Sequence, residues 1–111
     1  MKINKAVHGE VMVITIEEKE ANLSNSEQFK TQVIQEIAAG RHRLIISFIH
    51  VEYLDSSFLG ALVAILKALL PYEGRLILSG MNGDIVNLFE LTRLDKIFVL
   101  KENTDLALKE F

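Results

Sequence analysis

The sequence contains no cysteine, which excludes disulfide bonds and thiolate metal sites and is compatible with a reducing compartment. No hydrophobic run is long enough to cross a bilayer. The longest, Phe58 to Leu70, falls short of the ~20 residues that a spanning helix needs, and Lys67 interrupts it. The N-terminal residues lead into no apolar segment typical of a signal peptide. These absences predict a cytoplasmic protein with no direct membrane insertion.

Positive charge is scarce as well: 12 Lys and Arg stand against 15 Asp and Glu, for a net charge of −3. The densest basic cluster, Arg41-His42-Arg43, is best explained as a solvated loop, so nucleic acid is not predicted as a partner. The histidines, including His8 and His50, lie far apart, and no glycine-rich phosphate-binding motif is present. The sequence therefore predicts no metal and no cofactor.

Apolar runs of two kinds alternate along the 111 residues. Strands are predicted at residues 3–7, 11–16, 44–49, 75–79 and 97–100. Helices are predicted at 27–39, with Ser24 or Ser26 as N-cap, at 57–70 and 84–91, and after Asn103. Alternating strands and helices imply parallel strand pairs. We expect one α/β domain over residues 1–111, with a mixed, mostly parallel sheet of four to five strands flanked by about four helices.

A polar segment, Asp55-Ser56-Ser57, stands where a buried strand gives way to a helix. One such residue is enough to cap the free N–H groups of a first helical turn. Three in succession, at the end of a sheet strand where partners and ligands usually bind, leave a functional role open beside capping.

The helix that follows is apolar on all sides, with Lys67 as its only charge. A surface helix normally has a polar face, so this one is either covered on both sides or exposes an apolar patch for a partner. The sequence leaves both possibilities open.

Three segments together resemble one known family. Residues 51–60, VEYLDSSFLG, resemble the Asp-Ser-Ser-Gly-Leu-Gly signature of STAS domains, the anti-sigma factor antagonists. Residues 74–78 resemble the next strand of that family, and residues 88–98, LFELTRLDKIF, resemble its Leu-(Leu/Phe)-Glu-Leu-Thr-Gly-Leu-x-x-(Leu/Ile)-Phe stretch. The resemblance covers essentially the whole chain and implies a STAS-type fold.

The resemblance also implies a partner switch rather than an enzyme. In such families a serine kinase that doubles as an anti-sigma factor binds the unmodified antagonist and releases the sigma factor. The kinase phosphorylates the second serine of the signature, which prevents binding until a phosphatase restores it. Carried onto this chain, the phosphorylation site is Ser57. The implied partner-binding residues are Asp55, Ser56, Ser57, Phe58 and Asn22.

The sequence departs from the family pattern at four positions. Phe58 and Arg93 replace glycines, and Asn22 and Ser47 stand where aspartates are common. The large ring of Phe58 either shields Ser57 from a kinase or contacts a different partner.

Two alternatives to the switch remain. One is a structural subunit of a larger complex, such as a lipid-transporting ABC system. The other is an enzyme with Ser57 as nucleophile, but it lacks a Gly-x-Ser-x-Gly elbow and a histidine placed near Ser57 in the sequence. The identity of the partner and the oligomeric state stay open.

Overall fold

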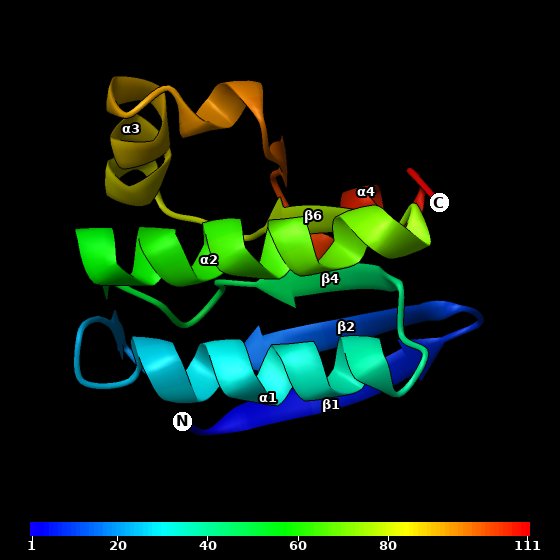
Figure 1. Ribbon diagram of the computed structural model, residues 1–111. Helices are drawn as coiled ribbons and strands as arrows, with labels where there is room; N and C mark the ends of the chain where they lie inside the picture. The colour runs from blue at the N-terminus through cyan, green and yellow to red at the C-terminus, as the bar shows by residue number, and fades with distance from the viewer.

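Five strands form one sheet in the computed structural model, which describes residues 1–111 (Figure 1). The strands lie in the order β1 (Ile3–His8), β2 (Val11–Ile16), β4 (Arg43–Ser47), β6 (Arg75–Ser79) and β7 (Val99–Lys101). β1 pairs antiparallel with β2, and the other neighbours are parallel. The predicted mixed, mostly parallel sheet is confirmed.

Four α-helices accompany the sheet, as predicted: α1 (Ser26–Ala38), α2 (Ser56–Leu69), α3 (Gly83–Leu91) and α4 (Thr104–Leu108). Two short 3-10 helices, η1 (Leu70–Tyr72) and η2 (Leu94–Lys96), follow α2 and α3. α1 and α2 lie side by side over one face of the sheet (Figure 1), where the main core of 22 buried residues is found. A smaller core forms around Ala107 of α4, against side chains of β2, β4 and β6.

Helix α2 is central to the molecule, and this position explains its composition. It packs against α1 and the sheet, and its large apolar side chains between residues 56 and 69 are all buried or half-buried. The helix is thus largely covered by α1 and the sheet, while Leu70, the last residue of the predicted helix, is 67% exposed. No helix of the chain combines the length and the apolarity needed to cross a membrane.

Several predicted boundaries need correction. The strand predicted at 44–49 is β4 and ends at Ser47. The N-cap of α1 is Asn25, rather than Ser24 or Ser26, and its side chain makes no capping bond because it binds within the preceding loop. α2 begins at Ser56, one residue early, because Asp55 is its N-cap. The last strand begins at Val99 rather than residue 97, since Ile97 ends the turn η2.

Two very short strands escape the sequence pattern altogether. β3 (Glu20–Ala21) and β5 (Tyr53–Leu54) pair in parallel as a separate two-stranded sheet. A two-residue strand is too short to show a period-two pattern. This pairing joins the segment before α1 to the segment before α2.

Candidate functional site

The β3–β5 pairing brings together two loops that lie about thirty residues apart in sequence. The Lys19 carbonyl accepts from the backbone N–H groups of Glu52 (2.7 Å) and Tyr53 (3.2 Å). The Ala21 carbonyl accepts from the N–H of Asp55 at 3.1 Å. As a result, the loop at residues 22–25 lies beside the first turn of α2.

Asp55 connects that loop to the helix. Its Oδ1 accepts from the backbone N–H of Phe58 at 3.0 Å, which caps α2. Its Oδ2 accepts from the backbone N–H of Leu23, also at 3.0 Å. The capping interpretation of the polar segment is therefore confirmed for Asp55. The same carboxylate also fixes where the loop before α1 sits.

Asn22 is half-buried in that loop and uses its side chain locally. Its Oδ1 accepts from the backbone N–H of Ser24 (3.0 Å) and from the Ser24 hydroxyl (2.6 Å), an arrangement typical of an Asx turn. Asn25 closes the loop, with Oδ1 accepting from the Asn22 N–H at 2.9 Å and Nδ2 donating to the Glu20 carbonyl at 2.8 Å. This network gives the loop a defined shape next to α2.

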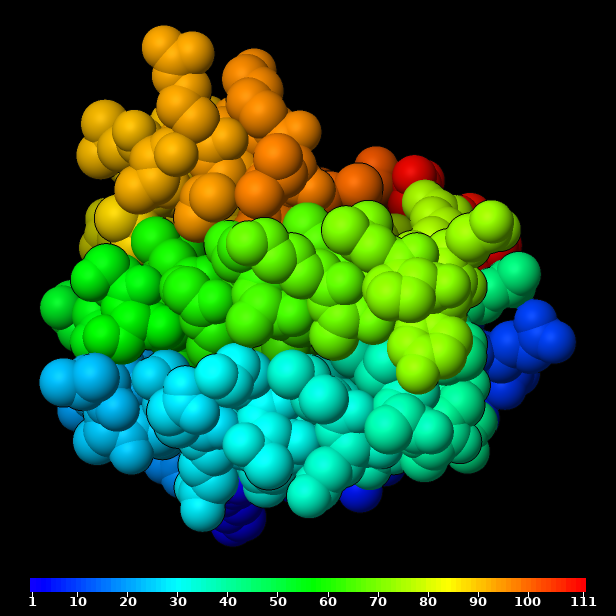
Figure 2. Space-filling model, in the orientation of Figure 1, coloured from blue at the N-terminus to red at the C-terminus, as the bar shows by residue number.

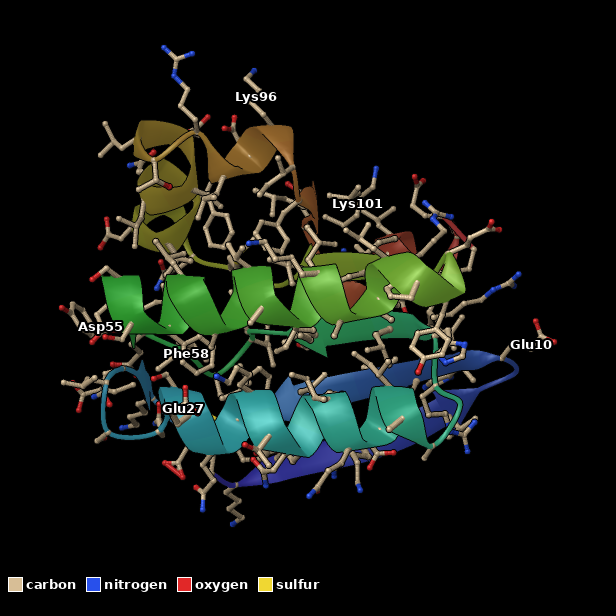
Figure 3. All side chains as sticks on the ribbon, in the orientation of Figure 1. Glu10, Glu27, Asp55, Phe58, Lys96 and Lys101 are labelled. Atoms are coloured by element: carbon tan, nitrogen blue, oxygen red, sulfur yellow. The ribbon has the colours of Figure 1, made fainter.

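The two serines differ from Asp55 because neither hydroxyl forms a hydrogen bond in the structure, so neither is needed as a cap. Ser57 is half-buried and lines a groove of about 340 Å³ between α1 and α2. Gly60 and Ala64 form the α2 wall of this groove, and the Glu27–Lys30 ion pair (2.7 Å) lies on the α1 side. Figure 3 shows Asp55 and Glu27 at the starts of the two helices.

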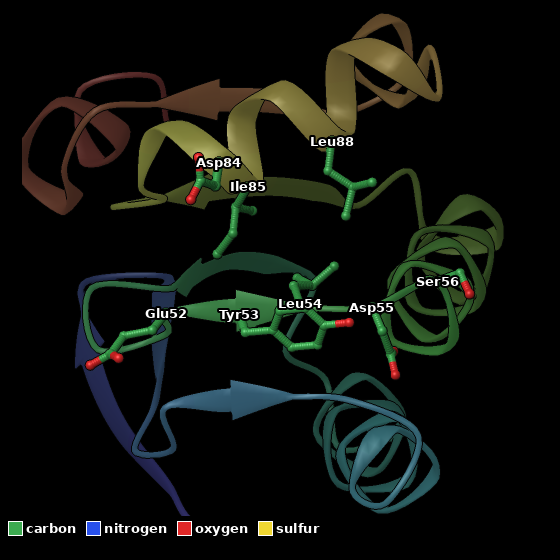
Figure 4. Close-up of a pocket in the computed structure, with 8 residues that line it drawn as sticks. All are labelled: Glu52, Tyr53, Leu54, Asp55, Ser56, Asp84, Ile85 and Leu88. Carbon is green, nitrogen blue, oxygen red and sulfur yellow. The ribbon is translucent and has the colours of Figure 1, made fainter.

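Ser56 is exposed and faces a different space. It lines a hollow of about 520 Å³ between β5 and α3, which we call the β5–α3 hollow (Figure 4). α3 and η2, yellow and orange in Figure 2, project from the body of the molecule beside the start of α2. The first turn of α2 thus presents one serine to each of two surface depressions.

Phe58 is not available to a partner. Its side chain is 0% exposed and lies between α1 and α2 (Figure 3). The ring stacks on Phe29 at a centroid distance of 5.0 Å and meets Phe48 edge-on at 6.4 Å. The structure contradicts the prediction that Phe58 binds a partner, because the ring fills the main core. For the same reason the ring does not cover Ser57 from the solvent side.

Two exposed apolar side chains flank the site and were not singled out from the sequence. Leu23 is 74% exposed in the loop before α1, and Tyr53 is 55% exposed on β5. Large exposed apolar side chains beside polar loops are common in protein interfaces. The sequence holds no signal for their exposure, because it depends on the β3–β5 pairing.

The described chain offers no cluster of three or more His, Cys, Asp or Glu side chains able to hold a metal ion. His50 is exposed, with Nε2 3.8 Å from a carboxylate oxygen of Glu17. No histidine hydrogen-bonds to Ser56 or Ser57. The site is therefore a surface formed by the loop before α1 and the first turn of α2, in which the Ser57 hydroxyl has no hydrogen-bond partner within the protein.

Comparisons with known proteins show which family the chain belongs to. The anti-sigma-B factor antagonist of Staphylococcus epidermidis is 31% identical over 99 residues, which cover 89% of this chain and 82% of that protein. A crystal structure of a candidate anti-sigma factor antagonist from Thermotoga maritima superposes with a TM-score of 0.89 at 25% identity, covering 97% of this chain and 92% of the other.

The Bacillus cell fate determinant SpoIIAA in its phosphorylated form shares the fold, with a TM-score of 0.74 at 21% identity, over 98% of this chain and 97% of the other. The family model for the STAS domain matches residues 2–108. The chain therefore belongs to the STAS domain family.

Proposed function

We propose that this protein is an anti-sigma factor antagonist, acting in the cytoplasm, whose partner is an anti-sigma factor with serine-kinase activity. In this proposal the unmodified protein binds that factor and so frees a sigma factor. Phosphorylation of Ser57 prevents binding, and a phosphatase restores it. The Staphylococcus epidermidis relative, named an anti-sigma-B factor antagonist, and the phosphorylated Bacillus structure support the proposal.

One observation carries the proposal: a serine hydroxyl without a hydrogen-bonding role lies at the start of a helix, beside a loop held in place by Asp55. The docking surface that we propose consists of Asp55, Ser56 and Ser57, together with Asn22 and its exposed neighbour Leu23. Asn22 and Asp55 contribute the shape of this surface, since their side-chain oxygens accept bonds within the protein.

A phosphate on Ser57 should lower the stability of the folded protein only slightly. The Ser57 hydroxyl makes no bond that modification breaks, and the groove that it lines is open to solvent. A phosphate adds about −1.5 to −2 charge near the positive end of the α2 dipole, where an anion is favoured. The Asp55 carboxylate two residues away opposes this gain by repulsion.

The same phosphate should weaken the binding of a partner far more strongly. A partner seated on the docking surface covers Ser57 and would have to desolvate a dianion there. Modification therefore changes binding much more than it changes folding. That difference is what a phosphorylation switch requires.

The alternatives draw less support. For a structural subunit of a larger complex, such as an ABC system, Phe58 offers no contact surface, because its ring is buried in the main core. For a serine hydrolase, the structure brings no histidine into hydrogen-bonding contact with Ser57.

The experiment is a phosphorylation assay with the anti-sigma factor that immobilised wild-type protein captures from a lysate of the source organism. With ATP present, we expect the wild type and Ser56→Ala to gain one phosphoryl group by intact mass. Ser57→Ala is expected to gain none and still to bind. Modification of Ser57→Ala, or no modification of the wild type, would refute Ser57 as the switch.

A further inference from the structure

The β5–α3 hollow is the largest depression of the molecule, and Ser57 does not line it. Its volume of about 520 Å³ lies within the range of small-ligand pockets. Its lining combines apolar, aromatic and acidic side chains, namely Glu52, Tyr53, Leu54, Asp55, Ser56, Asp84, Ile85 and Leu88.

The apolar part of the lining comes from both walls. Leu54 of β5 and Ile85 of α3 are buried, and Leu88, one turn further along α3, is half-buried (Figure 4). The half-exposed ring of Tyr53 adds an aromatic surface on the β5 side. A group that enters the hollow therefore needs an aliphatic portion to cover these side chains.

The charged part of the lining is entirely negative. Glu52, Asp55 and Asp84 contribute carboxylates, and no lysine, arginine or histidine lines the hollow. The side chains of Glu52 and Asp84 form no ion pair and no hydrogen bond within the protein. Asp55 accepts only from backbone N–H groups. No cationic side chain of the protein pairs with any of these three carboxylates.

The hollow is also held in a fixed shape. Asn82 caps α3 through its Oδ1, which accepts from the Ile85 N–H at 2.9 Å. Its Nδ2 donates to the Glu52 carbonyl at 3.1 Å, which ties the start of α3 to β5. A preformed site avoids part of the ordering cost of binding.

We propose that the β5–α3 hollow receives an arginine side chain of the anti-sigma factor; this inference rests on the proposed function and names the chemistry of the partner. An arginine has an aliphatic stem that covers apolar surface and a planar cationic head. The head pairs with carboxylates in a bidentate manner and stacks on aromatic rings such as Tyr53. An anionic or purely apolar group would leave the carboxylates unpaired and desolvated.

The test compares two double variants with the same change in charge. Glu52→Gln/Asp84→Asn removes the two unpaired carboxylates of the hollow. Glu73→Gln/Asp105→Asn is the matched control, because Asp84 and Asp105 both lie in the first turn of a helix and Glu73 is exposed. Both variants are titrated with the captured anti-sigma factor at several salt concentrations.

We expect the dissociation constant of the hollow variant to rise by roughly tenfold or more, and that of the control to change by less than about twofold. The salt dependence of binding should weaken only in the hollow variant. Equal effects in the two variants would overturn the inference, since only overall charge would then matter. That result would leave anti-sigma factor binding itself, and hence the proposed function, intact.

If the wild type binds no anti-sigma factor, the proposed function is wrong and the first test cannot be carried out. A second measurement then tests arginine binding to the hollow without any partner protein. Acetyl-arginine-amide is titrated into the labelled protein, with acetyl-citrulline-amide as the uncharged control. We expect saturable amide shifts at Tyr53, Ser56 and Asp84 that only the arginine probe produces and that Glu52→Gln/Asp84→Asn abolishes. No such shifts, or equal shifts from both probes, would overturn the inference.

Discussion

At the scale of single residues, Asp55 shows how one side chain can serve stability and function together. One of its oxygens caps α2 and the other fixes Leu23 in the loop before α1. The sequence predicts the cap, because aspartate before an apolar run is a standard N-cap. It does not predict the second bond, which depends on a residue 32 positions away.

Replacing Asp55 by alanine should therefore lower the free energy of unfolding more than the loss of an ordinary N-cap does. We expect Asp55→Ala to lower the free energy of unfolding by about 2–3 kcal/mol, since two backbone N–H groups lose their acceptor. Asn103→Ala is the control: Asn103 caps α4 with one bond to the Leu106 N–H, and its loss should cost about 1 kcal/mol. Urea unfolding measures both, and equal losses would contradict the double role of Asp55.

At the scale of elements, the contact between α1 and α2 depends on Phe58, the residue that replaces a glycine of the resembled signature. Its ring stacks on Phe29 of α1 and meets Phe48 just after β4. The sequence places Phe58 next to Ser57, the predicted phosphorylation site, and so allows a surface role. Only the direction in which the first turn of α2 faces decides that the ring enters the core.

Restoring the glycine of the family pattern should thus damage the fold. We expect Phe58→Gly to lower the free energy of unfolding by about 4–6 kcal/mol, the sum of a lost core ring and a poor helix former. That loss approaches the whole stability of many small domains, so Phe58→Leu, with an expected loss of about 1–2 kcal/mol, keeps the test measurable. Tyr53→Ala, on the surface, should change stability by less than about 0.5 kcal/mol. A harmless Phe58→Gly would show that the ring is not a core residue.

At the scale of the whole molecule, local sequence patterns predict the long strands and helices but not the contacts between segments that are distant in sequence. The five main strands and the helices follow from apolar runs of ordinary length, and parallel pairing follows from their alternation. The β3–β5 pair, the loop held by Asp55 and the β5–α3 hollow all depend on contacts between distant segments. The sequence predicts the central serines of the site, whereas its shape and its acidic side come from tertiary structure.

In the whole molecule, the residues that stabilise the fold and the proposed binding residue lie in different places. The core lies beneath α1 and α2, whereas Ser57 lines a surface groove between them. We expect Ser57→Asp to change the free energy of unfolding by less than about 1 kcal/mol, since the helix dipole offsets repulsion by Asp55.

Binding of the anti-sigma factor to Ser57→Asp should nevertheless weaken by roughly a hundredfold, because a charge at the docking surface must be desolvated. Thr31→Asp places the same charge on an exposed position of α1 and should leave binding unchanged. Urea unfolding and calorimetric titration measure the two quantities separately. If Ser57→Asp lost stability and affinity in proportion, the effect on binding would come from unfolding, and Ser57 would be a structural residue rather than the switch.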